Sequence, residues 1–187
     1  MKNEITTGRL LLRPFIEDDL EAIFICCRNP NLGNNAGWKP HETIEESREV
    51  LHEVFMAQEN VWAMIRLEDR QLIGSIGIIP DPKRENPRAL MIGYWLDETF
   101  WSKGYMTEAA KAVLDYGFEK LNLALITAYC YPHNERSSNL LKRQGFKYEG
   151  TLHQAELIDK GPIYDHQCYY LTKDTWKALN GNKEEKV

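Results

Sequence analysis

The sequence predicts a mixed α/β fold in which a central sheet of about seven strands carries helices on both faces. Two apolar runs, 61–66 and 72–79, flank a short polar turn and are typical of a β-hairpin. Two amphipathic helices, 107–120 and 134–143, then alternate with apolar strands, as they do in βαβ crossovers. A hairpin followed by crossovers places antiparallel and parallel strands in one sheet.

The N-terminal part of the chain supplies one strand and two helices to this fold. The apolar run 9–15 predicts the first strand, and residues 18–27 have the apolar spacing of a helix. Thr43 and Glu46 form a capping-box pattern for the second helix. The segment 29–40 between the two helices is rich in Asn, Gly and Pro, so we expect a loop there.

The C-terminal part of the chain completes the sheet and ends the domain. Four further strands are predicted at 89–96, 125–131, 146–154 and 165–171. A turn at 159–162 joins the last two strands, and a short helix follows at 173–179. With 187 residues the chain is long enough to bury a core as a single domain, 1–179, which a flexible tail, 180–187, follows.

Composition limits the classes of function. The net charge is −5 and the isoelectric point is near 5.6, which argues against direct binding of nucleic acid, because that binding needs a basic face. The chain has neither a run of 18 apolar residues nor the apolar core of a signal peptide, so we expect a cytoplasmic protein without a membrane span. The four cysteines form no Cys-x-x-Cys pair and the histidines show no metal-ligand spacing, so we expect free, mostly buried thiols and no metal.

The most informative segment is the strand, glycine-containing loop and helix start at 89–110. Such a connection can bind phosphate, because the first N–H groups of a helix have no intrahelical partner and the helix dipole favours an anion there. Ser102, Lys103 and Thr107 add side-chain donors around Gly104. Without other motifs, an ordinary strand-to-helix turn explains this pattern equally well.

Further motifs decide between these two interpretations. The run Trp101-Ser-Lys-Gly-Tyr-Met106, followed by Thr107-Glu-Ala109, resembles the pyrophosphate loop of the GNAT acetyltransferases. It keeps only the central glycine of the broad family pattern and is most similar to the RimJ/RimL type, which acetylates the N-terminal alanine of ribosomal proteins. The resemblance also includes Thr7 to Pro14, Pro132 to Phe146, Gln154-Ala-Glu156 and Asp165-His166. It spans residues 7 to 176 and implies a GNAT fold.

The resemblance implies acetyl-CoA as the cosubstrate. The residues expected to contact it are Tyr94, Trp95, Leu96, Trp101, Ser102, Lys103, Gly104, Tyr105, Met106, Thr107, Asn134 and Ser137. Backbone N–H groups of the strand 92–96 are expected to polarise the thioester where this strand bulges and splays from its neighbour, a distortion that Gly93 permits. Gly93 is also explained as a residue that avoids a packing clash.

Two residues carry the proton transfers that the resemblance implies. Ser137 is expected to protonate the leaving thiolate, and Glu156 is expected to act as the general base that takes a proton from the amine. Each has a simpler explanation. Asn134 and Ser137 are ordinary residues for a helix start, and a lone Glu on a strand is usually a solvated surface charge.

The sequence therefore predicts an acetyl-CoA-dependent N-acetyltransferase acting on the α-amine of an N-terminal Ala or Ser, for example that of a ribosomal protein. The alternative acceptor is a small amine such as a polyamine, an antibiotic or a toxin. The alternative of another class is a non-catalytic acyl-CoA-binding module. Near the acceptor, His153 and His166 are interpreted as structural, and Trp38 either closes over the acceptor or anchors the core. Monomer and homodimer both stay open.

Overall fold

The computed structural model describes residues 4–158 and 161–181. Their strands form one eight-stranded sheet in the order β1-β2-β3-β4-β5-β6-β8-β7. The strands are β1 (Ile5–Thr6), β2 (Leu10–Arg13), β3 (Val61–Arg66), β4 (Leu72–Pro80), β5 (Ala89–Leu96), β6 (Leu125–Cys130), β7 (Lys147–Leu157) and β8 (Ile163–Thr172). Neighbouring strands are antiparallel, except that β5 and β6 are parallel. The sheet is thus mixed, as predicted, with the short strand β1 added at its edge.

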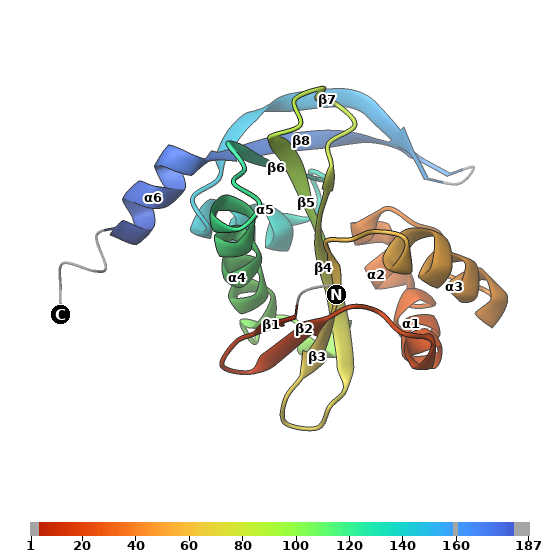
Figure 1. Cartoon of the computed structure of the whole chain (residues 1–187). Helices are drawn as coiled ribbons and strands as arrows, with labels where there is room; N and C mark the ends of the chain where they lie inside the picture. Colours follow the sequence, from red (N-terminus) through yellow and green to blue (C-terminus); the bar gives the residue numbers. More distant parts are fainter. Residues whose placement is uncertain (1–3, 159–160, 182–187) are drawn as a thin grey trace.

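Helices cover both faces of the sheet, also as predicted (Figure 1). One face carries α4 (Tyr105–Glu119), α5 (Glu135–Arg143) and α6 (Lys173–Gly181). The other carries α1 (Leu20–Cys27), α2 (Pro30–Ala36) and α3 (Ile44–Val50), which continues as a π-helical segment, Leu51–Met56. Alternation along β3 supplies both cores, because Trp62 and Met64 pack on the α4 side whereas Ala63 and Ile65 pack on the α1 side.

The two parallel strands separate along their length. β5 pairs with β6 only over its first three residues, 89–91, although both strands continue beyond that point. On its other side β5 keeps an unbroken register with β4 over 90–96. The splay expected from the sequence is therefore present, whereas the described residues of β5 show no bulge against β4.

The segment 29–40 differs from the prediction, because its first half is the helix α2. Asn29 is the N-cap residue, whose side chain accepts a hydrogen bond from the Asn31 N–H at 2.9 Å, and Pro30 opens the first turn. Gly37, with a φ of 91°, ends the helix. By composition Asn, Pro and Gly indicate a loop, but in this order they are the start and stop signals of a helix.

The ends of the predicted elements differ in smaller ways. α6 extends to Gly181, so residues 180 and 181, which were expected in the tail, are helical. The other residues of the expected tail, 182–187, lie outside the described residues. Residues 159 and 160 of the expected turn also lie outside them.

The four cysteines are free thiols, three of them buried and Cys168 half-buried. In the described part of the chain, no helix is both long enough and apolar enough to cross a membrane.

Candidate functional site

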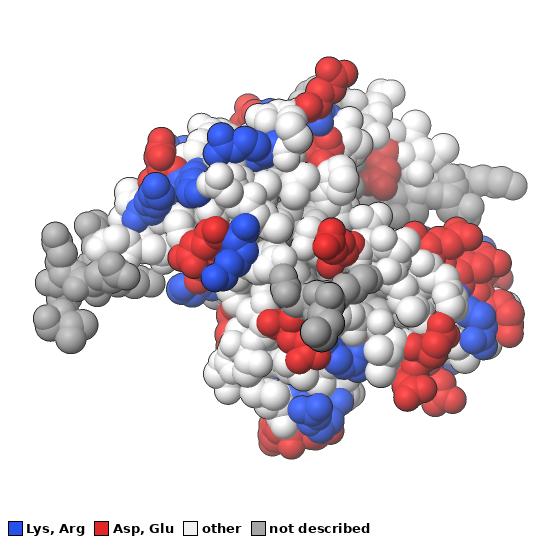
Figure 2. Space-filling model, viewed as in Figure 1, with Lys and Arg blue, Asp and Glu red and all other residues white. Residues whose placement is uncertain are grey.

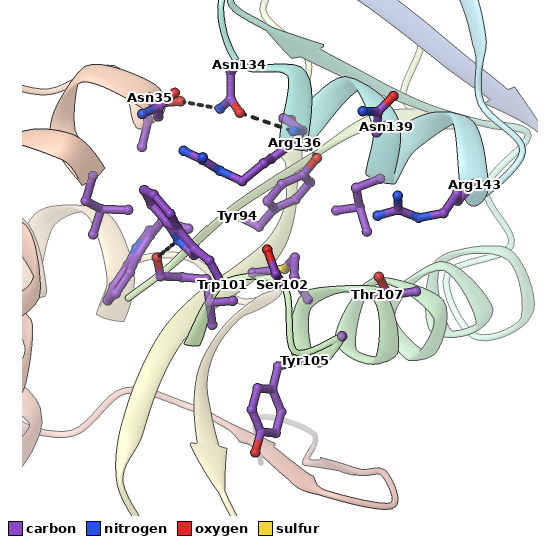
Figure 3. A pocket seen from close by; sticks show the side chains of 18 residues that line it. Asn35, Tyr94, Trp101, Ser102, Tyr105, Thr107, Asn134, Arg136, Asn139 and Arg143 are labelled. Atoms are coloured by element: carbon purple, nitrogen blue, oxygen red, sulfur yellow. Dashed lines mark hydrogen bonds between the residues drawn. The ribbon is translucent and has the colours of Figure 1, made fainter. Parts of the chain in front are cut away.

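A cavity of about 530 Å³ lies between β5, the start of α4 and the inner face of α5 (Figure 3). We call it the outer cavity. Its lining residues come from four elements and their loops: Leu32, Asn35, Ala36, Tyr94, Trp95, Leu96, Trp101, Ser102, Gly104, Tyr105, Met106, Thr107, Asn134, Arg136, Ser137, Asn139, Leu140 and Arg143. Eleven of the twelve residues expected to contact the cosubstrate are among them. The exception is Lys103, whose ammonium lies 5.4 Å from the centre of the Phe100 ring.

The loop that precedes α4 has an unusual backbone. Ser102 and Gly104 have φ angles of 60° and 81°, in the left-handed region that favours glycine. Gly104 is the N-cap residue of α4, and among the described residues no side chain caps this end. The loop is held from outside, because Arg9 donates a hydrogen bond to the Lys103 carbonyl at 3.0 Å and pairs with Glu108 at 2.7 Å. The uncapped start of α4, residues 104–107, thus lines the outer cavity, and the loop before it is tied to Arg9.

Two arginines of α5 add positive charge to the outer cavity. The Arg136 guanidinium lies 3.8 Å from the centre of the Trp101 ring, whose indole N–H donates to the Leu96 carbonyl at 2.7 Å. Arg143 lies two helical turns further along the same face of α5. Our sequence reasoning missed both arginines, although their spacing of seven residues was a usable signal for one helix face.

The start of α5 is capped and bears a hydroxyl. Asn134 accepts a hydrogen bond from the Ser137 N–H at 3.1 Å and donates one to the Asn35 carbonyl of α2 at 3.0 Å. The Ser137 hydroxyl lies 2.8 Å from that of Tyr94 on β5. Burial raises the pKa of the Tyr94 phenol, so this hydroxyl keeps its proton at neutral pH. Asn134 is therefore a cap, whereas the Ser137 side chain faces the splayed strands.

A second, smaller cavity of about 170 Å³ continues from the first into the gap between β5 and β6. We call it the inner cavity. The two share Asn35, Ala36, Tyr94, Asn134 and Ser137. Gly93 lines the inner cavity, and a Cβ placed on it would meet no atom within 4 Å among the described residues. A packing clash therefore does not explain this glycine.

Glu156 lies beside the inner cavity and contacts it through another residue. Its Oε2 accepts hydrogen bonds from the Tyr131 hydroxyl at 2.7 Å and from Nε2 of His166 at 2.8 Å. Tyr131 lines the inner cavity, whereas Glu156 is absent from the described lining of both cavities. The Glu156 side chain is 31% exposed, and with two buried partners it is not a simple surface charge. Sequence reasoning missed Tyr131, which no motif marks.

Trp38 is an anchor of the core. Its indole N–H donates to the Cys27 carbonyl at 3.3 Å, and its ring packs edge-on against Trp95 at 6.2 Å. The part of this segment that borders the cavities is α2, through Leu32, Asn35 and Ala36. The cavities are thus bordered on this side by the capped helix α2, which is hydrogen-bonded to Asn134 at the start of α5.

Charge is distributed unevenly over the molecule. Residues 13–53, which include α1, α2 and α3, carry nine carboxylates and four Lys or Arg side chains, a net charge of −5 that equals that of the whole chain. Figure 2 shows carboxylates gathered over α1 and α3, on the opposite side of the sheet from α4. This acidic region of the chain therefore attracts cations.

Comparisons with known proteins agree with this geometry. The family model of the acetyltransferase (GNAT) domain matches residues 9–147. The uncharacterized N-acetyltransferase YoaA of Bacillus subtilis is 31% identical over 173 residues, which cover 90% of this chain and 96% of the relative. The ribosomal protein uS5-alanine N-acetyltransferase of Escherichia coli is 33% identical over 109 residues, 58% of this chain and 55% of the relative.

Among solved structures, the spermidine N-acetyltransferase of Vibrio cholerae in complex with CoA and spermine has the same fold. Its TM-score is 0.76 at 23% identity, and the match covers 93% of this chain and 100% of that one. At this level of identity the likeness concerns the fold alone. The described residues also contain no group of three or more His, Cys, Asp or Glu side chains placed to hold a metal ion.

Proposed function

The chain is an N-acetyltransferase of the GNAT family, and we propose that it transfers the acetyl group of acetyl-CoA to the α-amine at a protein N-terminus. One observation carries the proposal. The uncapped start of α4, the arginines of α5 and Ser137 follow one another along two connected cavities. The same path leads through Tyr131 to Glu156, which supplies a base. This order matches the order of anion, leaving group and nucleophile in the reaction.

The proposal places the cosubstrate pyrophosphate at the loop 101–107. There the first N–H groups of α4 and the two guanidinium groups of α5 can hold negative charge. The thioester then lies in the gap between β5 and β6. The Asp97 N–H donates to the Ile73 carbonyl on β4 at 2.8 Å. N–H groups alternate sides along a strand, and Tyr94 lies three residues before Asp97, so the Tyr94 N–H points away from β4 and toward this gap. That N–H is the proposed donor to the thioester oxygen.

The acceptor amine attacks the thioester carbon directly, so a C–N bond forms and the C–S bond breaks. Glu156 receives the proton that the amine must lose, because an α-amine with a pKa near ~8 is mostly protonated at neutral pH. Ser137 donates a proton to the departing sulfur. The Ser137 oxygen takes a replacement proton from the Tyr94 hydroxyl, and solvent returns a proton to Tyr94, so both hydroxyls are protonated again at the end of the cycle.

Two observations support a protein N-terminus as acceptor. A relative of 33% identity over 58% of this chain is named as a ribosomal-protein alanine N-acetyltransferase. The acidic helices of residues 13–53 favour encounter with a basic partner. The second candidate acceptor is a polyamine, because the same carboxylates would attract it. A protein of the same fold is named as a spermidine N-acetyltransferase.

An acceptor panel tests this proposal. Peptides that begin with Ala or Ser, neutral or followed by several lysines, are compared with spermidine and free lysine by release of the CoA thiol. We expect the peptides to turn over fastest, with the acetyl group mapped to the α-amine by mass spectrometry. Added salt should slow the basic peptide more than the neutral one, because it screens remote charges. Faster turnover of spermidine than of every peptide would reject the protein acceptor and leave the acetyl transfer itself intact.

A further inference from the structure

The proposed base, Glu156, is separated from the reacting groups by one side chain. Tyr131, which follows directly after β6, lines the inner cavity, and its hydroxyl donates to Glu156 Oε2 at 2.7 Å. Gly37 at the end of α2 closes the other side of this pair, because a Cβ there would lie 2.5 Å from the Tyr131 hydroxyl oxygen and 3.5 Å from Glu156 Oε1. Of this pair, Tyr131 lines the inner cavity and Glu156 does not, so an amine in that cavity meets Tyr131 first.

His166 holds the same carboxylate oxygen from within the sheet. Its side chain is buried, with the whole residue 3% exposed, and Nε2 lies 2.8 Å from Glu156 Oε2. Nδ1 is buried without a hydrogen-bond partner among the described residues. A neutral ring with its proton on Nε2 fits both facts, because the ring then donates to the carboxylate. Burial lowers the pKa of His166, which favours that neutral form.

We propose that Tyr131 is a catalytic residue that relays the proton of the acceptor amine to Glu156, and that His166 is a positioning residue for the carboxylate. This proposal rests on the proposed function. An N–H bond of the amine breaks as a new O–H bond forms at Tyr131, and the original Tyr131 O–H bond breaks as the proton moves to Glu156 Oε2. The nitrogen lone pair thus freed attacks the thioester. The phenol is neutral before and after the step.

The surroundings of Tyr131 suit a relay that stays protonated. Burial, and next its hydrogen bond to Glu156, raise the pKa of the Tyr131 phenol, so phenolate does not form. The ring is held at 5.5 Å by a stacked His133 and at 4.9 Å by Tyr164. The ring contacts therefore hold the Tyr131 hydroxyl oxygen beside Glu156.

Other titratable groups surround the relay at a greater distance. Lys83 lies 4.2 Å from the centre of the Tyr129 ring, which stacks on His166 at 4.0 Å. Asp165 on β8 pairs with His153 at 2.9 Å. These groups set the local field, but the direct hydrogen bonds to Glu156 among the described residues come from Tyr131 and His166 alone.

The relay is tested with Tyr131→Phe beside Glu156→Gln, in the full chain and with the best acceptor of the panel. Both variants should lower turnover about 100-fold or more at pH 7, with acetyl-CoA affinity unchanged. Both should recover partly at high pH, where the amine loses its proton unaided. The matched control is Tyr148→Phe, because Tyr148 is exposed, its hydroxyl contacts that of Thr151 and it lines neither cavity. It should behave as the parent.

The outcomes separate the relay from the proposed function. If Glu156→Gln loses rate while Tyr131→Phe keeps the parent profile, the relay is wrong and Glu156 acts without Tyr131. If both keep the parent profile, the proposed base itself is wrong. A proton inventory of the parent in mixtures of H₂O and D₂O, under single-turnover conditions, gives a test that needs no variant. The relay predicts a curved dependence from two protons in motion, and a linear one would overturn it.

The positioning role of His166 is tested by two substitutions. His166→Leu removes the donor to Glu156, whereas His166→Gln keeps an N–H donor of similar reach. We expect the leucine variant to lose about 10-fold in turnover and to shift the acid limb of its pH profile to higher pH, because the carboxylate loses a donor to its charged form. The glutamine variant should restore both. Equal losses in the two variants with an unshifted profile would assign His166 to packing only.

Discussion

Two helices, α4 and α5, begin at the same cavity, but their first turns are capped in different ways. α4 starts at Gly104 with a left-handed φ of 81° and, among the described residues, no side-chain cap. α5 starts at Asn134, whose side chain accepts the Ser137 N–H at 3.1 Å. Both helix dipoles favour an anion, but the Asn134 side chain occupies the Ser137 N–H of α5, whereas no side chain among the described residues caps the N–H groups of α4.

This difference assigns distinct roles to the two helix starts. The start of α4 offers backbone donors, and the carboxylate in its first turn, Glu108, is paired with Arg9, so this helix start suits the phosphates of a cosubstrate. At the start of α5 a side-chain cap occupies the Ser137 N–H, and the Ser137 hydroxyl lies beside Tyr94. Substitutions in the loop that starts α4 should therefore change binding, whereas substitutions of Asn134 and Ser137 at the start of α5 should change stability or turnover.

The largest effect is expected for Gly104→Glu. A carboxylate at this position would lie beside the bound phosphates, and one repulsive pair at ~4 Å costs about 4 kcal/mol at an intermediate dielectric constant, roughly 1,000-fold in affinity. Titration calorimetry with acetyl-CoA measures it. Gly104→Ala is the matched control, because it imposes the same left-handed φ without the charge. Equal affinity of the folded glutamate variant and the parent would place the phosphates elsewhere.

The next effect is expected for Ser137→Ala on α5. Loss of the proton donor to the thiolate should lower turnover about 100-fold without recovery at high pH, while acetyl-CoA affinity stays within about twofold. Ser138→Ala is the control at the adjacent position, because the Ser138 hydroxyl donates to the Glu135 carbonyl and lines neither cavity. If Ser137→Ala turns over like the parent, another group protonates the thiolate.

A smaller effect is expected from the cations beside the two helix starts. Arg136→Gln removes a guanidinium that lines the outer cavity, and should weaken acetyl-CoA about 10-fold at low salt and less at high salt. Lys103→Gln removes the same charge from a side chain directed at Phe100. It should change affinity less than about twofold. A larger loss in the lysine variant would mean that the lysine turns into the cavity when the cosubstrate binds.

The same contrast explains how much could be predicted from the sequence. The loop 101–107 was predicted because strand, glycine and helix follow one another locally, and local order determines its backbone. The composition of the segment 29–40, rich in Asn, Gly and Pro, indicates a loop. The order of these residues indicates a helix instead, because Asn29 and Pro30 start α2 and Gly37 ends it. Tyr131 could not be found, because its contact with Glu156 joins residues 25 positions apart through the pairing of β6, β8 and β7.

The smallest effect is expected for Asn134, and it tests the cap directly. Asn134→Ala leaves the Ser137 N–H without its acceptor and removes the bond to the Asn35 carbonyl. The loss of a cap costs about 1 kcal/mol, which lowers Tm by roughly 2–4 °C in a chain of this size. Asn134→Ser keeps an oxygen for the cap and loses only the donor to Asn35.

Thermal unfolding of the three proteins therefore divides the two contacts of Asn134. The serine variant should lie between the parent and the alanine variant, because the cap is retained and the link between α5 and α2 is lost. Acetyl-CoA affinity should stay within about twofold in both, since the Asn134 side chain is already engaged by Ser137 and Asn35. A tenfold loss of affinity in Asn134→Ser at unchanged Tm would show instead that Asn134 holds the cosubstrate, and the contrast between the two helix starts would fail.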